Sequence, residues 1–178
     1  NCASYLNLDY LNKKGDGLAE GMAEHCKIDF NKIINNDIGA GGAQYVFDNV
    51  SYTTWEKAYR NSVFLYTYLH RNQDTFNRLD TENCVQVWCA EMWGVLWSLW
   101  DDGHKSIISK EMDFVFATDN IDTVKNIKIV HNAGVTSNNE GLFNKGDYAK
   151  KSPKNIELDI DKTKVSYFYY SYLKKVLC

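Results

Sequence analysis

A run of large apolar side chains in the middle of the chain constrains the fold more than any other feature. Residues 87–100 read VWCAEMWGVLWSLW, and from Trp88 onward Glu91 is the one charged residue. A helix that is apolar nearly all round has to be buried on more than one side. The run is too short to span a bilayer and ends in two aspartates. We therefore expect a buried helix over about residues 83–101.

The length and composition favour one folded domain. At 178 residues the chain can bury one substantial core, and aromatic residues make up 14% of the sequence. A net charge of -3 gives no whole-protein attraction to nucleic acid or to an anionic membrane. Five irregularly spaced cysteines without a CxxC pair favour reduced thiols and a cytoplasmic protein. The chain opens at Asn1 without an initiator methionine, which indicates a piece of a longer polypeptide.

We divide this single domain, residues 1–178, into three segments. Residues 1–36 are polar and contain several glycines, so we expect irregular structure with a short helix from Leu18 to Cys26. Residues 37–150 hold the core elements. Residues 151–178 form an aromatic C-terminal segment, and its run VSYFYYSYLKKVL suits either a strand or a helix that docks onto the domain.

One long helix is expected early in the core segment. Thr53 and Glu56 match a capping box, which predicts a helix that begins there and continues to about His70. Four large side chains follow at helical spacing and predict the buried face of this helix: Trp55, Tyr59, Val63 and Tyr66.

Short apolar runs predict strands before and after the two helices. They cover about residues 44–47, 106–109, 112–117 and 127–130, and the last is β-branched and nearly fully apolar, as is typical of a central strand. With these strands and two helices we expect an α/β domain in which a mixed sheet is flanked by helices.

A polar motif follows the last of these strands. His131 comes directly after the apolar run, at the carboxyl end of a strand, where open α/β sheets bind ligands. Its imidazole can bind phosphate or a metal, Asn132 offers an amide, Gly134 frees the backbone, and Lys145 supplies a positive charge suited to phosphate. The alternative is a plain strand that ends in a polar surface loop.

Two features nearer the N-terminus are also candidates. A carboxylate among tryptophans is costly unless it is paired or lies in a cleft, so Glu91 is a candidate catalytic acid; alternatively it lies on the one solvated stripe of its helix. The turn at Gly41 and Gly42 lacks a phosphate-binding fingerprint, which favours close packing of backbone against a helix or ligand.

Weaker alternatives remain open. Cys89 and His131 could form a catalytic pair, although no nucleophile signature surrounds the cysteine. Asp159 and Asp161 form a D-x-D triplet in a lysine-rich segment, where a solvated loop is the simpler interpretation.

Three segments, taken in order, resemble the second half of glycosyltransferases encoded in phage and large-virus genomes. They are GGAQYVF at 41–47, VWCAEMWGVLWSLW at 87–100 with EMDFVFATD at 111–119, and HNAGV with LFNKGDY within 131–148. Those proteins are similar in layout to GT-A enzymes of the glycogenin-like class, which transfer a sugar from a nucleotide diphosphate donor with a divalent metal, usually Mn²⁺. The resemblance implies a GT-A-like partial domain and, for a viral protein, the host cytoplasm.

The resemblance also implies roles for single residues. His131 would be a metal ligand and Glu91 would face the acceptor and donor sugar. The donor would be bound by the following residues: Gly41, Gly42, Gln44, Asn132, Gly134 and Lys145. The upstream D-x-D strand of the family has no counterpart here, so the resemblance implies a missing N-terminal half. The rival hypothesis is a noncatalytic carbohydrate- or protein-binding module, which keeps the aromatic surfaces without the metal chemistry.

Overall fold

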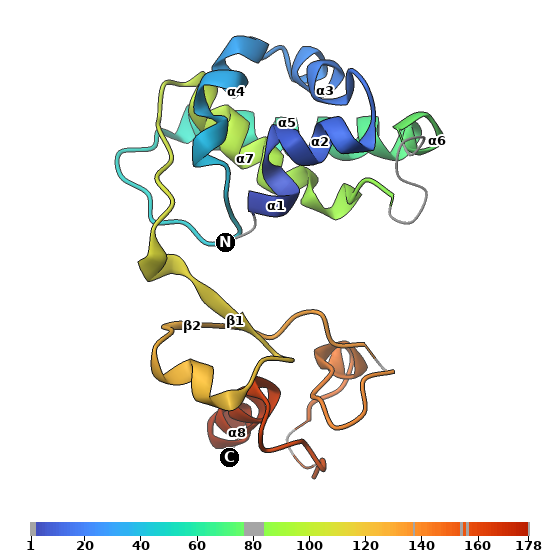
Figure 1. Ribbon diagram of the computed structural model, residues 1–178, viewed down its shortest axis with the longest axis vertical. Coiled ribbons are helices and arrows are strands. Elements are labelled where there is room, and N and C mark those ends of the chain that lie inside the picture. Colours follow the sequence, from blue (N-terminus) through green and yellow to red (C-terminus); the bar gives the residue numbers. More distant parts are fainter. Residues whose placement is uncertain (1–2, 77–83, 137, 154, 156, 178) are drawn as a thin grey trace. The chain divides into compact units, whose positions relative to one another are not determined.

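The computed structural model describes residues 3–76, 84–136, 138–153, 155 and 157–177, and these form two compact units, Asn1–Ile108 (unit 1) and Ser109–Cys178 (unit 2). The described part of unit 1 contains helices and no strand, whereas unit 2 holds a two-stranded parallel sheet and one long helix (Figure 1). The expected mixed sheet of a GT-A-like α/β domain is therefore wrong, since the described residues are mostly helical. That the two units together form a single domain stays a prediction.

The elements follow one another in a simple order, with short 3-10 helices written η. Unit 1 contains α1 (Ala3–Leu6), α2 (Leu8–Lys14), α3 (Leu18–Cys26), α4 (Phe30–Asn36), η1 (Asp37–Gly39), α5 (Tyr52–Arg71), α6 (Gln73–Phe76), η2 (Val87–Cys89) and α7 (Ala90–Asp101). Unit 2 contains η3 (Lys110–Met112), β1 (Phe114–Phe116), η4 (Ile121–Lys125), β2 (Ile129–His131), η5 (Lys145–Tyr148) and α8 (Val165–Leu177).

Helix α7 is the buried centre of unit 1, as its composition predicted. The side chains of Trp93, Trp97 and Trp100 are almost fully buried. The indole of Trp93 donates to the carbonyl of Leu6 at 3.2 Å, which ties the N-terminal helices to α7. The helix begins at Ala90 and not near residue 83, because the backbone before it first forms the 3-10 turn η2. Residue 83 itself lies outside the described residues.

Helix α5 packs against α7 through a different face from the one expected. Its N-cap is Ser51, whose Oγ accepts from the backbone N–H of Thr54 at 3.2 Å, so the predicted cap at Thr53 is wrong by two residues. The predicted apolar face is also wrong, since its four members are between 39% and 72% exposed. The buried face consists of Thr54, Ala58, Asn61, Leu65 and Leu69.

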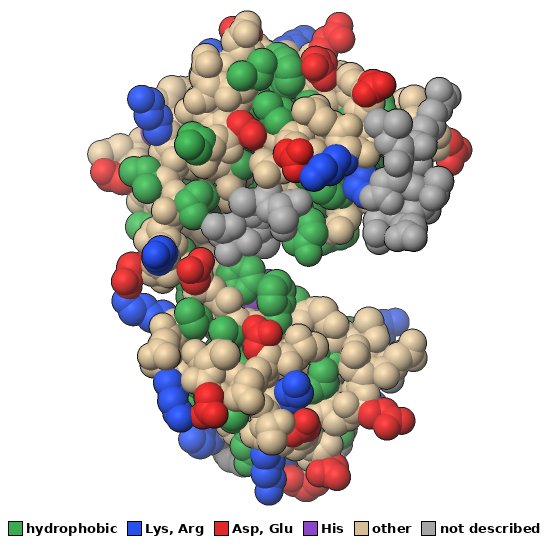
Figure 2. All heavy atoms as spheres, in the orientation of Figure 1, with side chains coloured by type: hydrophobic (Ala, Val, Ile, Leu, Met, Phe, Trp, Pro, Cys, Tyr) green, Lys and Arg blue, Asp and Glu red, His purple; other side chains and the backbone are tan. Residues whose placement is uncertain are grey.

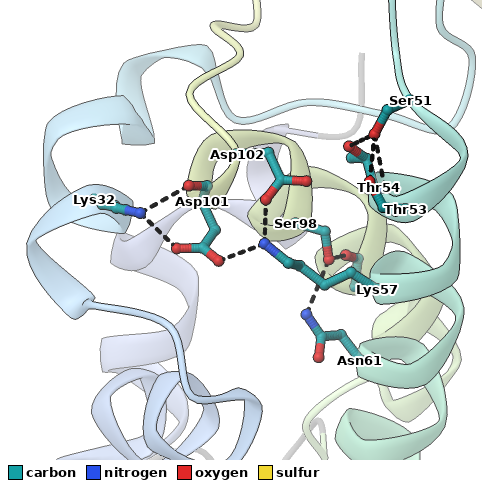
Figure 3. Close-up of polar contacts among 10 residues, drawn as sticks. Lys32, Ser51, Thr53, Thr54, Lys57, Asn61, Ser98, Asp101 and Asp102 are labelled. Carbon is teal, nitrogen blue, oxygen red and sulfur yellow. Dashed lines mark hydrogen bonds and ion pairs between the residues drawn. The ribbon is translucent and has the colours of Figure 1, made fainter.

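Small and polar residues let α5 and α7 approach closely. A Cβ atom at Gly94 of α7 would lie 2.7 Å from the backbone nitrogen of Ser62 on α5, so only glycine fits there. Beside this contact, the amide of Asn61 donates to Ser98 Oγ at 2.9 Å, and that hydroxyl donates to the carbonyl of Gly94 at 2.6 Å (Figure 3). The Asn61 amide and the Ser98 hydroxyl, both buried, therefore find hydrogen-bond partners within the helix contact itself.

An ion cluster joins three helices at the end of α7. Lys57 of α5 pairs with Asp101 at 2.7 Å and with Asp102, and Lys32 of α4 pairs with the other oxygen of Asp101 at 2.7 Å (Figure 3). Burial acts to raise the pKa of the Asp101 carboxyl, but hydrogen bonds and charge from the two lysines outweigh it and lower that pKa. The cluster was missed in the sequence, where two aspartates after the apolar run read only as a helix end.

The N-terminal segment is helical, in contrast to the irregular structure expected. Helix α3 has the predicted bounds, Leu18–Cys26. Helices α2 and α4 are capped by the side chains of Asn7 and Asp29, each of which accepts a backbone hydrogen bond. Residues 44–47 and 106–109, expected as strands, form no regular structure.

Unit 2 is built around a short parallel pair. Strands β1 and β2 align Phe114 with Ile129 and Phe116 with His131, so both predicted strands exist in shorter form. The C-terminal aromatic run is a helix, α8, which docks as expected: the backbone N–H of Ser166 donates to Ala117 next to β1 at 3.0 Å. A small hydrophobic core packs the segments before α8 against that helix, and its buried residues are Phe143, Ile160 and Tyr170.

The described helices include no candidate for spanning a membrane. No described helix is both long and apolar enough to cross a bilayer. Figure 2 shows hydrophobic side chains at the surface of both units, interspersed with acidic and basic ones.

Candidate functional site

His131 ends strand β2 and lies against aromatic rings of the neighbouring strand. Its ring centroid is 5.2 Å from that of Phe114 and 5.8 Å from that of Phe116. Burial lowers the pKa of the imidazole, and the positive charge of Lys145 lowers it further. A neutral imidazole presents one N–H donor and one acceptor nitrogen. Neither nitrogen makes a hydrogen bond with any residue that the structure describes.

Lys145 lies near His131 although thirteen residues separate them in the sequence. It begins η5, whose N-cap Asn144 accepts from the backbone N–H of Gly146 at 3.0 Å. The Lys145 side chain is exposed, and no acidic side chain in the described part of the chain pairs with it. The structure thus brings together the two basic residues that the sequence singled out.

Asn132 and Gly134 shape the backbone beside this pair. The Asn132 side chain is buried and its Nδ2 donates to the carbonyl of Phe143 at 3.3 Å, which fixes the end of β2 against the segment before Lys145. Its Oδ1 has no partner among the described residues. Gly134 has a φ of 76° and its Cα faces open space, so a ligand can approach the backbone there.

The pair is suited to an anion. The positive charge of Lys145, which no acidic side chain of the described residues pairs with, and the N–H of the neutral His131 imidazole would together attract a phosphate or diphosphate. Among the described residues no group of three His, Cys, Asp or Glu side chains could hold a metal ion. His131 could supply one ligand, so these residues alone do not fit a Mn²⁺ site, and the Mn²⁺ expectation stays a prediction.

The other predicted site residues belong to unit 1. Gly41 and Gly42 serve close packing: a Cβ at Gly41 would lie 2.5 Å from Ile108 Cδ1, and one at Gly42 would lie 2.9 Å from Tyr45 Oη. The hydroxyl of Tyr45 donates to the carbonyl of Gly41 at 2.8 Å and holds this turn. Gln44 follows it and is half-buried. A role of these three residues toward a donor sugar stays a prediction.

Glu91 lies in the first turn of α7 with an exposed side chain. The expectation that tryptophans desolvate its carboxylate is wrong, because α7 turns this position to solvent while Trp93 and Trp97 face the core. The alternative interpretation, a solvated stripe, describes its position. Its assignment as a catalytic acid stays a prediction without that physical support.

The structure also bears on the Cys89–His131 pair and on the D-x-D triplet at Asp159 and Asp161. Cys89 is fully buried in the core of unit 1, so its thiol is closed to a substrate. Asp159 and Asp161 are exposed on either side of the buried Ile160, which fits the solvated loop.

A groove between α3 and α5 was missed in the sequence. It is lined by Gly21, Glu24, His25, Lys27, Phe64 and Tyr68. The helical spacing of residues 21, 24 and 25 would place them on one face, but nothing in the sequence says that α5 covers that face.

Comparisons with known proteins give no family assignment. No protein family model matches the chain, no curated protein matches it, and no solved structure matches it.

Proposed function

We propose that this chain is part of a glycosyltransferase that uses a nucleotide sugar, and that unit 2 binds the diphosphate of the donor. The observation that carries the proposal is the proximity of His131 to Lys145 at the carboxyl end of β2, where no acidic side chain of the described residues forms an ion pair with the lysine. The carboxyl ends of parallel strands are where nucleotides bind in many proteins.

In this reaction the two side chains would stabilise the negative charge that develops on the departing diphosphate. In glycosyl transfer, the bond between the anomeric carbon and the diphosphate oxygen breaks and its electron pair stays on the diphosphate. The acceptor hydroxyl oxygen forms the new bond to the anomeric carbon, and its proton passes to a phosphate oxygen of the departing diphosphate. Lys145 would hold the charge that develops on the departing oxygens, and neutral His131 would donate its N–H to one of them. The open backbone at Gly134 would let a phosphate oxygen come close.

A noncatalytic binding module is the second candidate. It is favoured by the row of exposed aromatic side chains along α5, since exposed apolar patches mark binding surfaces. The two candidates differ in whether the chain binds a nucleoside diphosphate.

Titration calorimetry separates them. The probes are uridine, guanosine, cytidine and adenosine diphosphates, each with and without Mn²⁺. We expect one of them to bind, and Lys145→Gln to weaken binding by about tenfold or more, since a charge-assisted hydrogen bond contributes about 1.5–3 kcal/mol. Lys150→Gln is the matched control because Lys150 is also exposed and also has no ion-pair partner in the described part of the chain. Absence of binding to all four probes, or equal weakening by both variants, would overturn the proposal.

A further inference from the structure

The groove between α3 and α5 is large enough for a small molecule. Its volume is about 530 Å³, which lies within the usual range for small-molecule sites. The walls come from two helices that are distant in the sequence: residues 21–25 on α3 and residues 64–68 on α5. It lies in unit 1 and includes none of the residues assigned to the diphosphate.

Glycine at position 21 brings the α5 wall close to α3. A Cβ atom on Gly21 would lie 2.2 Å from Tyr68 Oη, so any larger residue would push the tyrosine ring away. Lys27 stands at the C-cap of α3 with a φ of 58°, where the chain turns out of the helix. These two backbone features shape the groove.

Aromatic rings form the apolar wall. The ring of His25 is tilted over that of Tyr68 with centroids 5.1 Å apart, and it meets Phe64 edge to face at 5.8 Å. Phe64 remains 45% exposed although its ring contacts that of His25, which is a large exposed fraction for a phenylalanine. Its free surface is available for contact with C–H groups.

Four polar side chains of the groove are free for a ligand. Glu24, His25, Lys27 and the Tyr68 hydroxyl make no side-chain hydrogen bond and no ion pair with any residue that the structure describes. The carboxylate accepts, the ammonium donates, and the imidazole and phenol can do both. The groove therefore offers donors and acceptors beside an aromatic surface.

The opposite charges of Glu24 and Lys27 favour a neutral ligand over an anion or a cation. An anion attracted by Lys27 would meet Glu24, and a cation attracted by Glu24 would meet Lys27. A purely apolar ligand would make no hydrogen bond with these polar groups. Ring hydroxyls each donate and accept, and the C–H face of a sugar ring packs on aromatic side chains. We propose that this groove binds a neutral pyranose, through its C–H face on Phe64 and its hydroxyls on Glu24, Lys27 and Tyr68.

NMR titration of the full chain tests this proposal. The probes are the methyl glycosides of glucose, galactose, mannose and N-acetylglucosamine, with glycine, phenylalanine and inorganic phosphate as zwitterionic and anionic comparisons. We expect at least one glycoside to shift the signals of Gly21 and His25, and Phe64→Ala to weaken its binding by about tenfold or more. Phe64 is exposed, so this variant keeps the fold; Glu24→Gln, also exposed, is the second variant and weakens binding less.

Tyr66→Ala is the matched control, because Tyr66 is an exposed aromatic residue of α5 outside the groove. The proposal is overturned if no glycoside moves the groove signals, if phosphate or an amino acid moves them more than every glycoside, or if Phe64→Ala and Tyr66→Ala bind alike. Since no nucleotide or metal is added, failure here leaves the diphosphate proposal untouched, and failure of the calorimetry leaves this one untouched.

Discussion

The close contact of α5 with α7 gives the sharpest expectation for stability, through Gly94→Ala. The new Cβ would lie 2.3 Å from Ser62 Oγ, 2.7 Å from Ser62 N and 2.8 Å from Ser62 Cα. The hydroxyl can rotate away, but the two backbone atoms cannot, so the helices have to move apart.

The magnitude follows from two opposing terms. Overpacking of a tight core costs about 1–3 kcal/mol, and a clash with backbone belongs at the upper end. Replacing glycine by alanine inside a helix gains up to about 1 kcal/mol. We therefore expect Gly94→Ala to lower the free energy of unfolding of unit 1 by about 2 kcal/mol.

Urea unfolding followed by tryptophan fluorescence measures this change. All five tryptophans lie in residues 55–100, so the signal reports unit 1 alone. Glu91→Ala is the control on the same helix, since Glu91 is exposed and its loss should change the free energy by less than about 1 kcal/mol. An unfolding midpoint for Gly94→Ala equal to or above that of the wild type would refute the close approach.

Three further outcomes are expected. Asp101→Asn should destabilise unit 1 by about 1–3 kcal/mol in the same assay, because it removes the carboxylate that pairs with both lysines at a partly buried site and leaves Lys57 with Asp102 alone. The folded pKa of Asp101 lies below the usual 3.8, so the stabilisation by this carboxylate is complete above pH 3.8 and is lost as the pH falls through the folded pKa. The urea midpoint measured against pH checks this, and Asp101→Asn should flatten that pH dependence. Iodoacetamide followed by peptide mapping should modify exposed Cys84 in the folded protein but leave Cys26 and Cys89 unmodified until denaturant is added, because both are buried and burial raises the pKa of Cys26 to about 12.

Some of the fold could be predicted because local pattern and burial agree. The nearly all-apolar run gave α7, and the bounds of α3 followed from its composition. The buried face of α5 could not be predicted: its aromatic residues have the right spacing, but the close approach at Gly94 brings the stripe with Ala58, Asn61 and Leu65 against α7. Helices of seven residues such as α2 and α4 are marginal by propensity alone, so packing onto the core decides whether they form.

The candidate sites divide in the same way. His131 and Lys145 stood out because a strand end followed by a basic residue is a local signal, and the structure brings them together. Glu91 was misjudged because the sequence does not say which side of α7 faces solvent. The groove depends on a contact between Gly21 and Tyr68, which lie more than forty positions apart in the sequence, so no local pattern predicts it.

An NMR pH titration of the His131 imidazole tests the proposed diphosphate site most directly. Burial and Lys145 hold its pKa below the usual 6.5 in the free protein, so Lys145→Gln should raise that pKa. A bound nucleoside diphosphate adds negative charge beside the ring and favours the imidazolium, so saturation with the diphosphate that binds in calorimetry should also raise it. A pKa of His131 that stays unchanged in both experiments would contradict the account.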